Sequence, residues 1–235
     1  MERIFKWPPP QTSDGGIKIG VFVERLSSGQ PHCGFIRVEP DTTGYLLHLR
    51  DQVNLRDERA RNGIVCIIVS VSPIRAEAIA QRAQAIATAD KSRGIRFGLS
   101  SPDQDWFHAE GHAIYGNDHL GLTCSHFVLA FFRDVGLPLV QYETWPERAE
   151  DIEWQERFCR HALSGEAEQD KTALVRQEAM EKEIGSKRVR PLEVAGAALA
   201  EARDLPVEFS VANELSKKVE IIMLENPWYD GGAGI

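Results

Sequence analysis

Residues 121–136 read GLTCSHFVLAFFRDVG, and this stretch decides the fold. Its apolar side chains recur at helical spacing at positions 127, 128, 131, 132 and 135, and Thr123 offers a hydroxyl that can cap a helix N-terminus. Gly136 and Pro138 then supply a stop signal. The stretch therefore predicts a helix with one buried face, and it puts Cys124 in the first turn of that helix.

Cys124 is the strongest candidate for a reactive group. The first turn of a helix has amide N–H groups without intrahelical partners and lies at the positive end of the helix dipole, and both effects favour a thiolate over a thiol. A nucleophilic cysteine also needs a base within hydrogen-bonding distance and a polar group that orients this base. Two upstream histidines, His32 and His48, are suited to these roles.

The two histidines belong to a predicted β-hairpin. Short strands are expected on either side of the turn sequence at residues 40–44, which reads PDTTG. Because paired antiparallel strands can bring such positions close together, His32 can act as the base and His48 as the orienting group. Asp51 and Glu39 lie near the ends of these strands, and either could serve as the third member instead of His48.

Composition narrows the class of protein. The chain has 235 residues, 43% of them hydrophobic, and a net charge of −8 without a cluster of Lys and Arg, so we expect no nucleic-acid partner. It contains no run of about 18 apolar residues, so we expect no membrane span. The cysteines are scattered and form no C-x-x-C pair, which indicates reduced thiols and a cytoplasmic setting, unless a signal without a recognisable pattern delivers the protein to another cell.

The remaining pattern predicts an α+β fold with an antiparallel sheet packed against the Cys124 helix. Strands are expected at residues 17–26, 32–39, 45–49 and 64–71, with short late strands at 207–209 and 219–224. Helices are expected at 74–90, 145–163, 171–184 and 191–202, and irregular segments at 1–15, 50–62 and 91–120. Because the composition shifts beyond Tyr142, we divide the chain into a catalytic core, 1–143, and a mostly helical C-terminal extension, 144–235, that packs on it.

A loop rich in histidine offers a metal-binding alternative, formed by His108, His112 and His119. The first two have the i, i+4 spacing of a zinc-binding helix, but the glutamate is not placed as in H-E-x-x-H and Gly111 disfavours a helix. A zinc deaminase would need a second cysteine three residues after Cys124, and this position is Phe127. The interpretation that we favour therefore has no metal and no cofactor.

The other cysteines and the histidine next to the nucleophile have simpler interpretations. Cys33 follows His32 on a strand, so its side chain points to the opposite face and is expected to pack in the core. Cys66 and Cys159 have no evident partner and are expected to be inert. For His126 we expect a structural hydrogen bond. A binding module without catalytic activity is the remaining alternative.

Two segments resemble a known family. Pro31–Val38 and Tyr45–Leu49 resemble the H-W-x-x-Y-V-G…V-x-H-L hairpin of the lecithin:retinol acyltransferase-like proteins, and Cys124–Val128 resembles their N-C-E-H-F-V motif. The resemblance covers roughly residues 17–140. In this chain Thr123 stands where the family has asparagine, and Ser125 where it has glutamate.

The resemblance implies a permuted papain-like (NlpC-type) fold, in which the histidine precedes the cysteine in sequence. It also implies Cys124 as nucleophile, His32 as base and His48 as third member of the triad. We therefore expect a cysteine hydrolase that cleaves an amide or peptide bond through an acyl-thioester, with a peptide or other amide-containing molecule as substrate. An acyltransferase or esterase that acts on acyl substrates is the second expectation.

Overall fold

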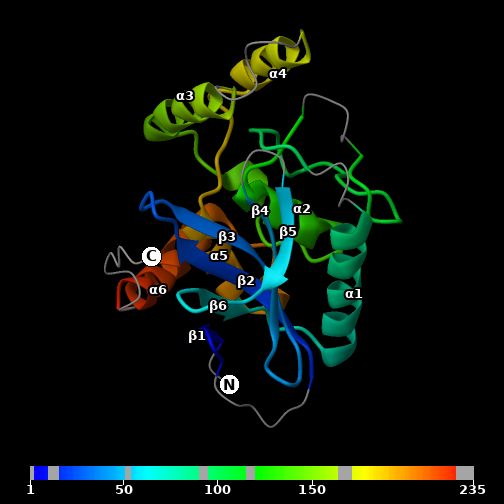
Figure 1. Ribbon diagram of the computed structural model, residues 1–235. Coiled ribbons are helices and arrows are strands. Elements are labelled where there is room, and N and C mark those ends of the chain that lie inside the picture. Colours follow the sequence, from blue (N-terminus) through cyan, green and yellow to red (C-terminus); the bar gives the residue numbers. More distant parts are fainter. Residues whose placement is uncertain are drawn as a thin grey trace.

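The protein is built on an antiparallel sheet whose strands follow the order β1-β6-β2-β3-β4-β5 (Figure 1). The computed structural model describes residues 3–9, 16–50, 54–89, 95–114, 120–163 and 171–225. The strands are β1 (Ile4–Lys6), β2 (Lys18–Arg25), β3 (Pro31–Val38), β4 (Gly44–Arg50), β5 (Asn54–Arg59) and β6 (Val65–Ile68). Together with the helices, this sheet confirms the predicted α+β class.

The helices fall into two groups in space. Those that share the large core with the sheet are α1 (Pro73–Ala89), α2 (Cys124–Asp134), α5 (Pro191–Leu199) and α6 (Phe209–Leu224). The other two, α3 (Ala149–Leu163) and α4 (Lys171–Lys182), stand off from the sheet at the top of Figure 1. Two short 3-10 turns lie at Tyr142–Thr144 and Ala202–Asp204. Within the described residues, no helix has the length and apolar character needed to cross a membrane.

The two faces of the sheet carry separate cores. Alternating strand residues such as Cys33 and Phe35 enter the large core, which also takes Phe131 from α2 and Val194 from α5. The large core thus draws side chains from both sides of residue 143. The opposite face holds a smaller cluster formed by Phe22, Ile36, Val38, Leu46, Ile64 and Cys66.

The ends of α2 agree with the sequence prediction. The Thr123 hydroxyl accepts a hydrogen bond from the His126 N–H at 3.1 Å, which caps the N-terminus. At the other end Gly136 has a φ of 68°, and the Leu137 N–H donates to the Phe132 carbonyl at 2.8 Å, as in a Schellman motif. These two caps hold Cys124 in the first turn of the helix.

Four predictions about strands are wrong. The strand expected at 219–224 is the second half of α6, whose buried residues Ala212, Ser216, Val219 and Met223 follow a helical spacing. At 207–209, Val207 forms only an isolated bridge with Val140, and Phe209 begins α6. The segment read as a charged connection contains β5, an edge strand with the sequence NLRDER, which lacks the apolar alternation of a half-buried strand. The expected irregular start likewise contains β1.

Candidate active site

Cys124 lies where the first turn of α2 meets the beginning of β3. Both the thiol and the backbone N–H of Cys33 donate hydrogen bonds to its sulfur, and His32 is hydrogen-bonded to it as well. The Cys33 thiol bond is the largest influence on the pKa of Cys124; burial opposes it, and the charge of His32 adds to it. The result is a pKa well below the usual thiol range, so the site favours the thiolate.

A line of hydrogen bonds leads from this sulfur to a carboxylate. The His32 Nε2 lies 2.8 Å from the His48 Nδ1, and the His48 Nε2 lies 3.2 Å from the Glu58 Oε1. Glu58 is in turn paired with Arg61. We call His32, His48 and Glu58 the histidine line. Because its Nε2 is used by His48, His32 has its Nδ1 left to face Cys124.

The two histidines of the line have opposite pKa shifts. Burial lowers the pKa of His32, but the charge of Cys124 and the hydrogen bond to its sulfur outweigh burial, so the pKa ends above 6.5. For His48, burial and the neighbouring His32 cation lower the pKa to about 4. At neutral pH His48 is therefore uncharged, with its Nε2–H donating to Glu58 and its Nδ1 accepting from His32. This arrangement leaves one mobile proton, between His32 and Cys124.

A glycine makes room for His48. A Cβ at Gly34 would lie 2.4 Å from the His48 Cβ and 2.4 Å from the Phe22 ring, far closer than van der Waals contact allows. The Phe22 ring stands edge-on to the His48 ring, with the centroids 5.3 Å apart. His48 is fully buried between these neighbours, so β3 and β2 fix the orientation of its imidazole.

The helix N-terminus also provides amide donors. Among the described residues, no carbonyl accepts the backbone N–H of Cys124 or Ser125, whereas Thr123 caps His126 with its hydroxyl and Phe127 with its carbonyl. Such N–H groups beside a nucleophile can hold the oxyanion of a tetrahedral intermediate. The Ser125 hydroxyl lies 3.7 Å from the Cys33 sulfur.

A cleft of about 400 Å³ opens beside Cys124. Its apolar part comes from Phe97 and from Trp154 and Phe158 of α3, whose rings stack with their centroids 5.1 Å apart. The remaining lining residues are Leu26, Gln30, Pro31, His32, Thr123, Ser125, Arg188, Val189, Arg190 and Pro191. The cleft thus places an aromatic surface and two arginines within the same cavity as the thiol.

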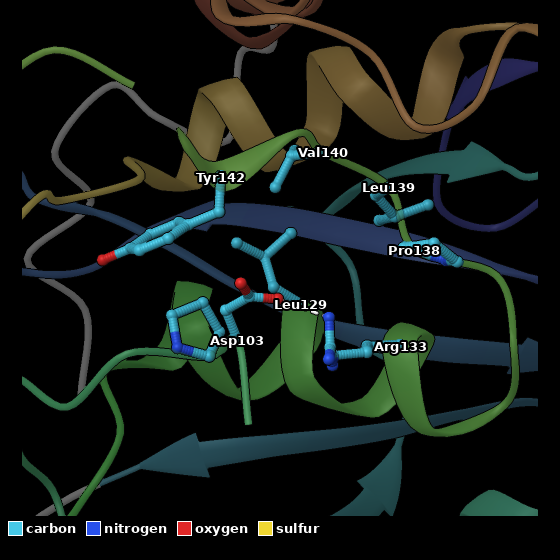
Figure 2. A pocket seen from close by; sticks show the side chains of 8 residues that line it. Asp103, Leu129, Arg133, Pro138, Leu139, Val140 and Tyr142 are labelled. Atoms are coloured by element: carbon cyan, nitrogen blue, oxygen red, sulfur yellow. Dashed lines mark hydrogen bonds and ion pairs between the residues drawn. The ribbon is translucent and has the colours of Figure 1, made fainter. Parts of the chain in front are cut away.

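A second hollow, shown in Figure 2, lies over the other end of α2. It measures only about 20 Å³, and its charged groups, Arg133 and Asp103, are paired with each other. Neither Cys124 nor His32 lines it. We therefore place the candidate site in the larger cleft.

The structure brings together the three residues proposed from sequence, Cys124, His32 and His48. Of the alternative third members, Asp51 lies outside the described residues. Glu39 follows the far end of β3, roughly 23 Å from His32 at the usual rise of a strand, and is paired with Arg37.

Two contributors were missed by sequence reasoning, and both touch the predicted triad. Glu58 lies on a charged edge strand that carries no apolar signal, and only the pairing of Leu46 with Glu58 puts it beside His48. Cys33 enters the large core, as expected, but the N-terminus of α2 meets that face, so its thiol also bonds to Cys124. Alternation along a strand indicates the face of a side chain, but not what covers that face.

His126 has the structural role predicted for it. Its Nδ1–H donates to the Ser100 carbonyl at 2.8 Å, and its Nε2 accepts from the Val189 N–H at 3.5 Å. Burial lowers its pKa to about 4, so the ring stays neutral.

His108 and His112, the two described residues of the metal-binding alternative, do not lie on a helix. The His108 N–H donates to the His112 carbonyl at 2.8 Å, and Gly111 has a φ of 96°, which together make a tight turn. His119 lies outside the described residues. Within the part of the chain that the structure describes, no three His, Cys, Asp or Glu side chains gather as metal ligands would.

Comparison of the chain with models of known protein families, with curated proteins and with solved structures finds no match.

Proposed function

We propose that this protein is a thiol hydrolase that cleaves an amide or peptide bond through an acyl-thioester, with Cys124 as nucleophile and His32 as base. The observation that carries the proposal is the histidine line. His32 is hydrogen-bonded to the Cys124 sulfur, and hydrogen bonds of 2.8 and 3.2 Å then connect His32 to His48 and His48 to the Glu58 carboxylate. A buried cysteine that only packs in a core needs none of these partners.

The first half of the reaction follows from the position of the mobile proton. His32 holds the proton on Nδ1, and the Cys124 thiolate attacks the carbonyl carbon of the substrate. The negative oxygen that forms accepts hydrogen bonds from the free N–H groups of Cys124 and Ser125, an interaction worth roughly 2.7–4 kcal/mol per donor in comparable sites. His32 then gives its proton to the leaving nitrogen, the C–N bond breaks and a thioester remains.

The second half returns the enzyme to its starting state. Neutral His32 removes a proton from a water molecule, which attacks the thioester carbonyl, and the C–S bond breaks to release a carboxylic acid. His48 remains neutral, because burial and, while His32 is protonated, the neighbouring cation lower its pKa to about 4. Its part is to hold the His32 ring in one tautomer and to pass the influence of the Glu58 charge to that ring.

The order of the site residues supports a permuted papain-like (NlpC-type) architecture. The histidines lie on β3 and β4, upstream of the cysteine helix α2, as the resemblance implies. An acyltransferase or esterase is the second candidate, and the aromatic surface formed by Phe97, Trp154 and Phe158 favours it, because such a surface accepts an acyl chain. The chemistry at Cys124 is the same in either case, and only the leaving group or the acceptor differs.

Iodoacetamide labelling followed by mass spectrometry tests the proposal. We expect rapid alkylation of Cys124 at neutral pH and slow alkylation of Cys33, Cys66 and Cys159, three buried thiols whose pKa burial raises. A screen of fluorogenic amides and esters with wild-type protein and Cys124→Ala then identifies the bond that is cleaved, with Cys159→Ala as control. Equal, slow labelling of all four thiols would contradict the enzyme and favour a binding module.

A further inference from the structure

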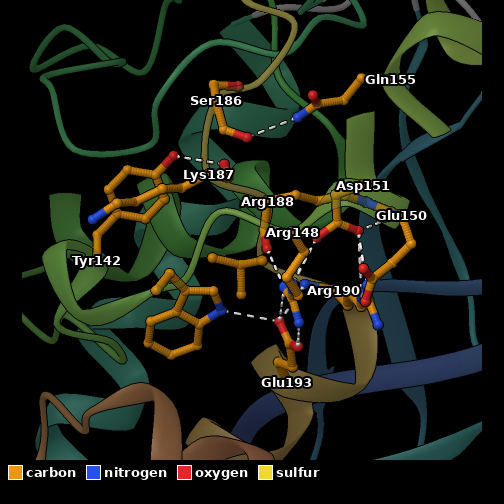
Figure 3. Close-up of polar contacts among 12 residues, drawn as sticks. Tyr142, Arg148, Glu150, Asp151, Gln155, Ser186, Lys187, Arg188, Arg190 and Glu193 are labelled. Carbon is orange, nitrogen blue, oxygen red and sulfur yellow. Dashed lines mark hydrogen bonds and ion pairs between the residues drawn. The ribbon is translucent and has the colours of Figure 1, made fainter. Parts of the chain in front are cut away.

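A charged network borders the cleft that His32 also lines. Its members are Arg148, Asp151, Arg188, Arg190 and Glu193, which we call the arginine network (Figure 3). They come from the beginning of α3, from the segment that leads into α5, and from α5 itself. Arg188 and Arg190 line the cleft together with Cys124. The network therefore puts fixed positive charge where a substrate must lie.

The network holds more positive than negative charge. The Asp151 carboxylate, 3% exposed, accepts hydrogen bonds from three guanidinium groups, those of Arg148, Arg188 and Arg190. Glu193 is occupied by Arg148, by the Trp145 indole and by the Arg190 N–H. Thus two buried carboxylates face three guanidinium groups. The nearby Glu150, which pairs with Arg190, is 65% exposed and screened by water.

Arg188 is the member of the network with the most unused hydrogen-bonding capacity among the described residues. Its Nη1 donates to Asp151 at 3.0 Å, and among the described residues no acceptor is bonded to its Nε or Nη2. Burial lowers the pKa of Arg188, and the Asp151 carboxylate only partly offsets this effect. A buried guanidinium whose charge is only partly compensated binds a carboxylate ligand more strongly than a fully solvated guanidinium does.

The Arg188 side chain is also held in a fixed orientation. Its guanidinium carbon lies 3.5 Å from the centroid of the Trp154 ring, and Trp154 stacks on Phe158. Stacking on an aromatic face fixes the plane of a guanidinium and leaves its edge free for planar acceptors. Asp151 holds one end of this group and Trp154 holds its face, so the free N–H groups are positioned before any ligand arrives.

We propose that Arg188, held by Trp154 and Asp151, forms a carboxylate-binding subsite beside Cys124, so that the amide cleaved is one that carries a free carboxylate close to the scissile bond. This inference rests on the proposed function and adds a substrate class to it. The carboxylate accepts from Arg188, and an apolar substituent next to it lies against Trp154 and Phe158. An N-acyl amino acid and the last peptide bond of a peptide both have this chemistry.

A pair of alkylating reagents isolates the contribution of the carboxylate. N-iodoacetylglycine and N-iodoacetylglycinamide have the same reactive carbon and differ in that one ends in a carboxylate and the other in a neutral amide. In both, the Cys124 sulfur bonds to the CH₂ carbon and iodide leaves with the electron pair. A thiolate alone repels the anion and reacts faster with the amide. We expect wild-type Cys124 to react faster with the acid, and this preference to decrease as salt is added.

Variants assign the effect to Arg188. In Arg188→Gln the acid-to-amide rate ratio should fall about tenfold, which corresponds to ~1.4 kcal/mol. Because both reagents alkylate the same sulfur, a change in the reactivity of the thiolate itself cancels in this ratio. Arg133→Gln removes the same charge from the far end of α2 and should leave the ratio unchanged. Arg188→Lys keeps the charge without the planar fork and should retain only part of the preference.

The possible failures are distinguishable. If wild-type Cys124 reacts faster with the amide than with the acid, or if Arg188→Gln and Arg133→Gln have the same ratio as wild type, the subsite is wrong although the hydrolase proposal stands. If Cys124 reacts with every reagent, iodoacetamide included, as slowly as Cys159, the proposed function itself fails. Should Arg188→Gln fail to fold, the wild-type ratio and its salt dependence still decide the question.

Discussion

The histidine line and the arginine network are both largely buried polar systems that border one cleft, yet they are built for different tasks. The histidine line contains groups whose pKa values lie within reach of neutral pH: that of His32 is raised and that of His48 is lowered to about 4. Guanidinium groups keep their charge at any physiological pH. The first system can therefore move a proton, whereas the second supplies a positive charge that does not change during a reaction.

The two systems also differ in how they are anchored. The histidine line ends at Glu58, which is 35% exposed and borders Arg61, whereas the arginine network is centred on Asp151, which is 3% exposed. A carboxylate that solvent reaches can be altered with little loss of stability, but a buried one that holds three cations cannot. Substitutions in the first system should therefore change activity, and those at the centre of the second should change stability.

The largest effect is expected from His32→Ala, which removes the base. Proton transfer by a positioned side chain contributes about 10²- to 10⁴-fold to the rate of a reaction. Hydrolysis of any amide identified by the screen should fall by this factor, and iodoacetamide labelling of Cys124 at neutral pH should slow as well. His108→Ala, at an exposed histidine on a loop, is the control and should behave as wild type. A His32→Ala protein with wild-type labelling and turnover would remove the histidine line from the mechanism.

The next effect concerns stability and is expected at the centre of the arginine network. Asp151→Asn leaves Arg148, Arg188 and Arg190 without their shared counter-charge, and loss of one partner of a buried ion pair costs about 3–5 kcal/mol. Urea unfolding measures this loss. Glu150→Gln, which changes an exposed carboxylate one residue away, should unfold at the same urea concentration as wild type. Equal stability of the two variants would show that the network contributes nothing to the fold.

A third prediction concerns pH. Because the pKa of Cys124 lies well below the usual thiol range, its alkylation rate should already be at a plateau near pH 7 and should fall only in acid. Removal of the Cys33 donor raises the pKa of Cys124. In Cys33→Ala the fall of the alkylation rate in acid, which we call the acid limb of the pH profile, should therefore move to higher pH. Cys66→Ala empties a buried position in the smaller core and should leave the limb in place.

The rate of amide hydrolysis should also fall at high pH, where His32 loses the proton that the leaving nitrogen needs. This fall is the second limb of the pH profile. The pKa of His32 is raised, so this limb lies above pH 6.5. Both limbs belong to the coupled pair of groups rather than to either residue alone. An acid limb that is the same in Cys33→Ala and wild type would show that the Cys33 thiol does not stabilise the thiolate.

Local sequence patterns predicted one side of the cleft much better than the other. The hairpin turn at 40–44 and the capped helix after Thr123 are local signals, and with them the convergence of His32, His48 and Cys124 could be expected. The arginine network has no such signal, because Asp151 and Arg188 meet only through the packing of a distant segment against α3. Long-range packing of charged residues does not produce a periodic pattern, so the composition of 144–235 predicted only a mostly helical extension that packs on the core.

The smallest effect is expected from Glu58→Gln, at the exposed end of the histidine line. The amide oxygen of glutamine can still accept from the His48 Nε2–H, so the tautomer of His48 is kept while the negative charge is lost. Because Glu58 lies two hydrogen bonds from His32 and is partly solvated, we expect turnover to fall by about tenfold or less. Glu58→Ala, which also removes the acceptor, should lose more. If both variants lose equally, the charge of Glu58 and not its hydrogen bond supports His32. If neither differs from wild type, the functional line ends at His48.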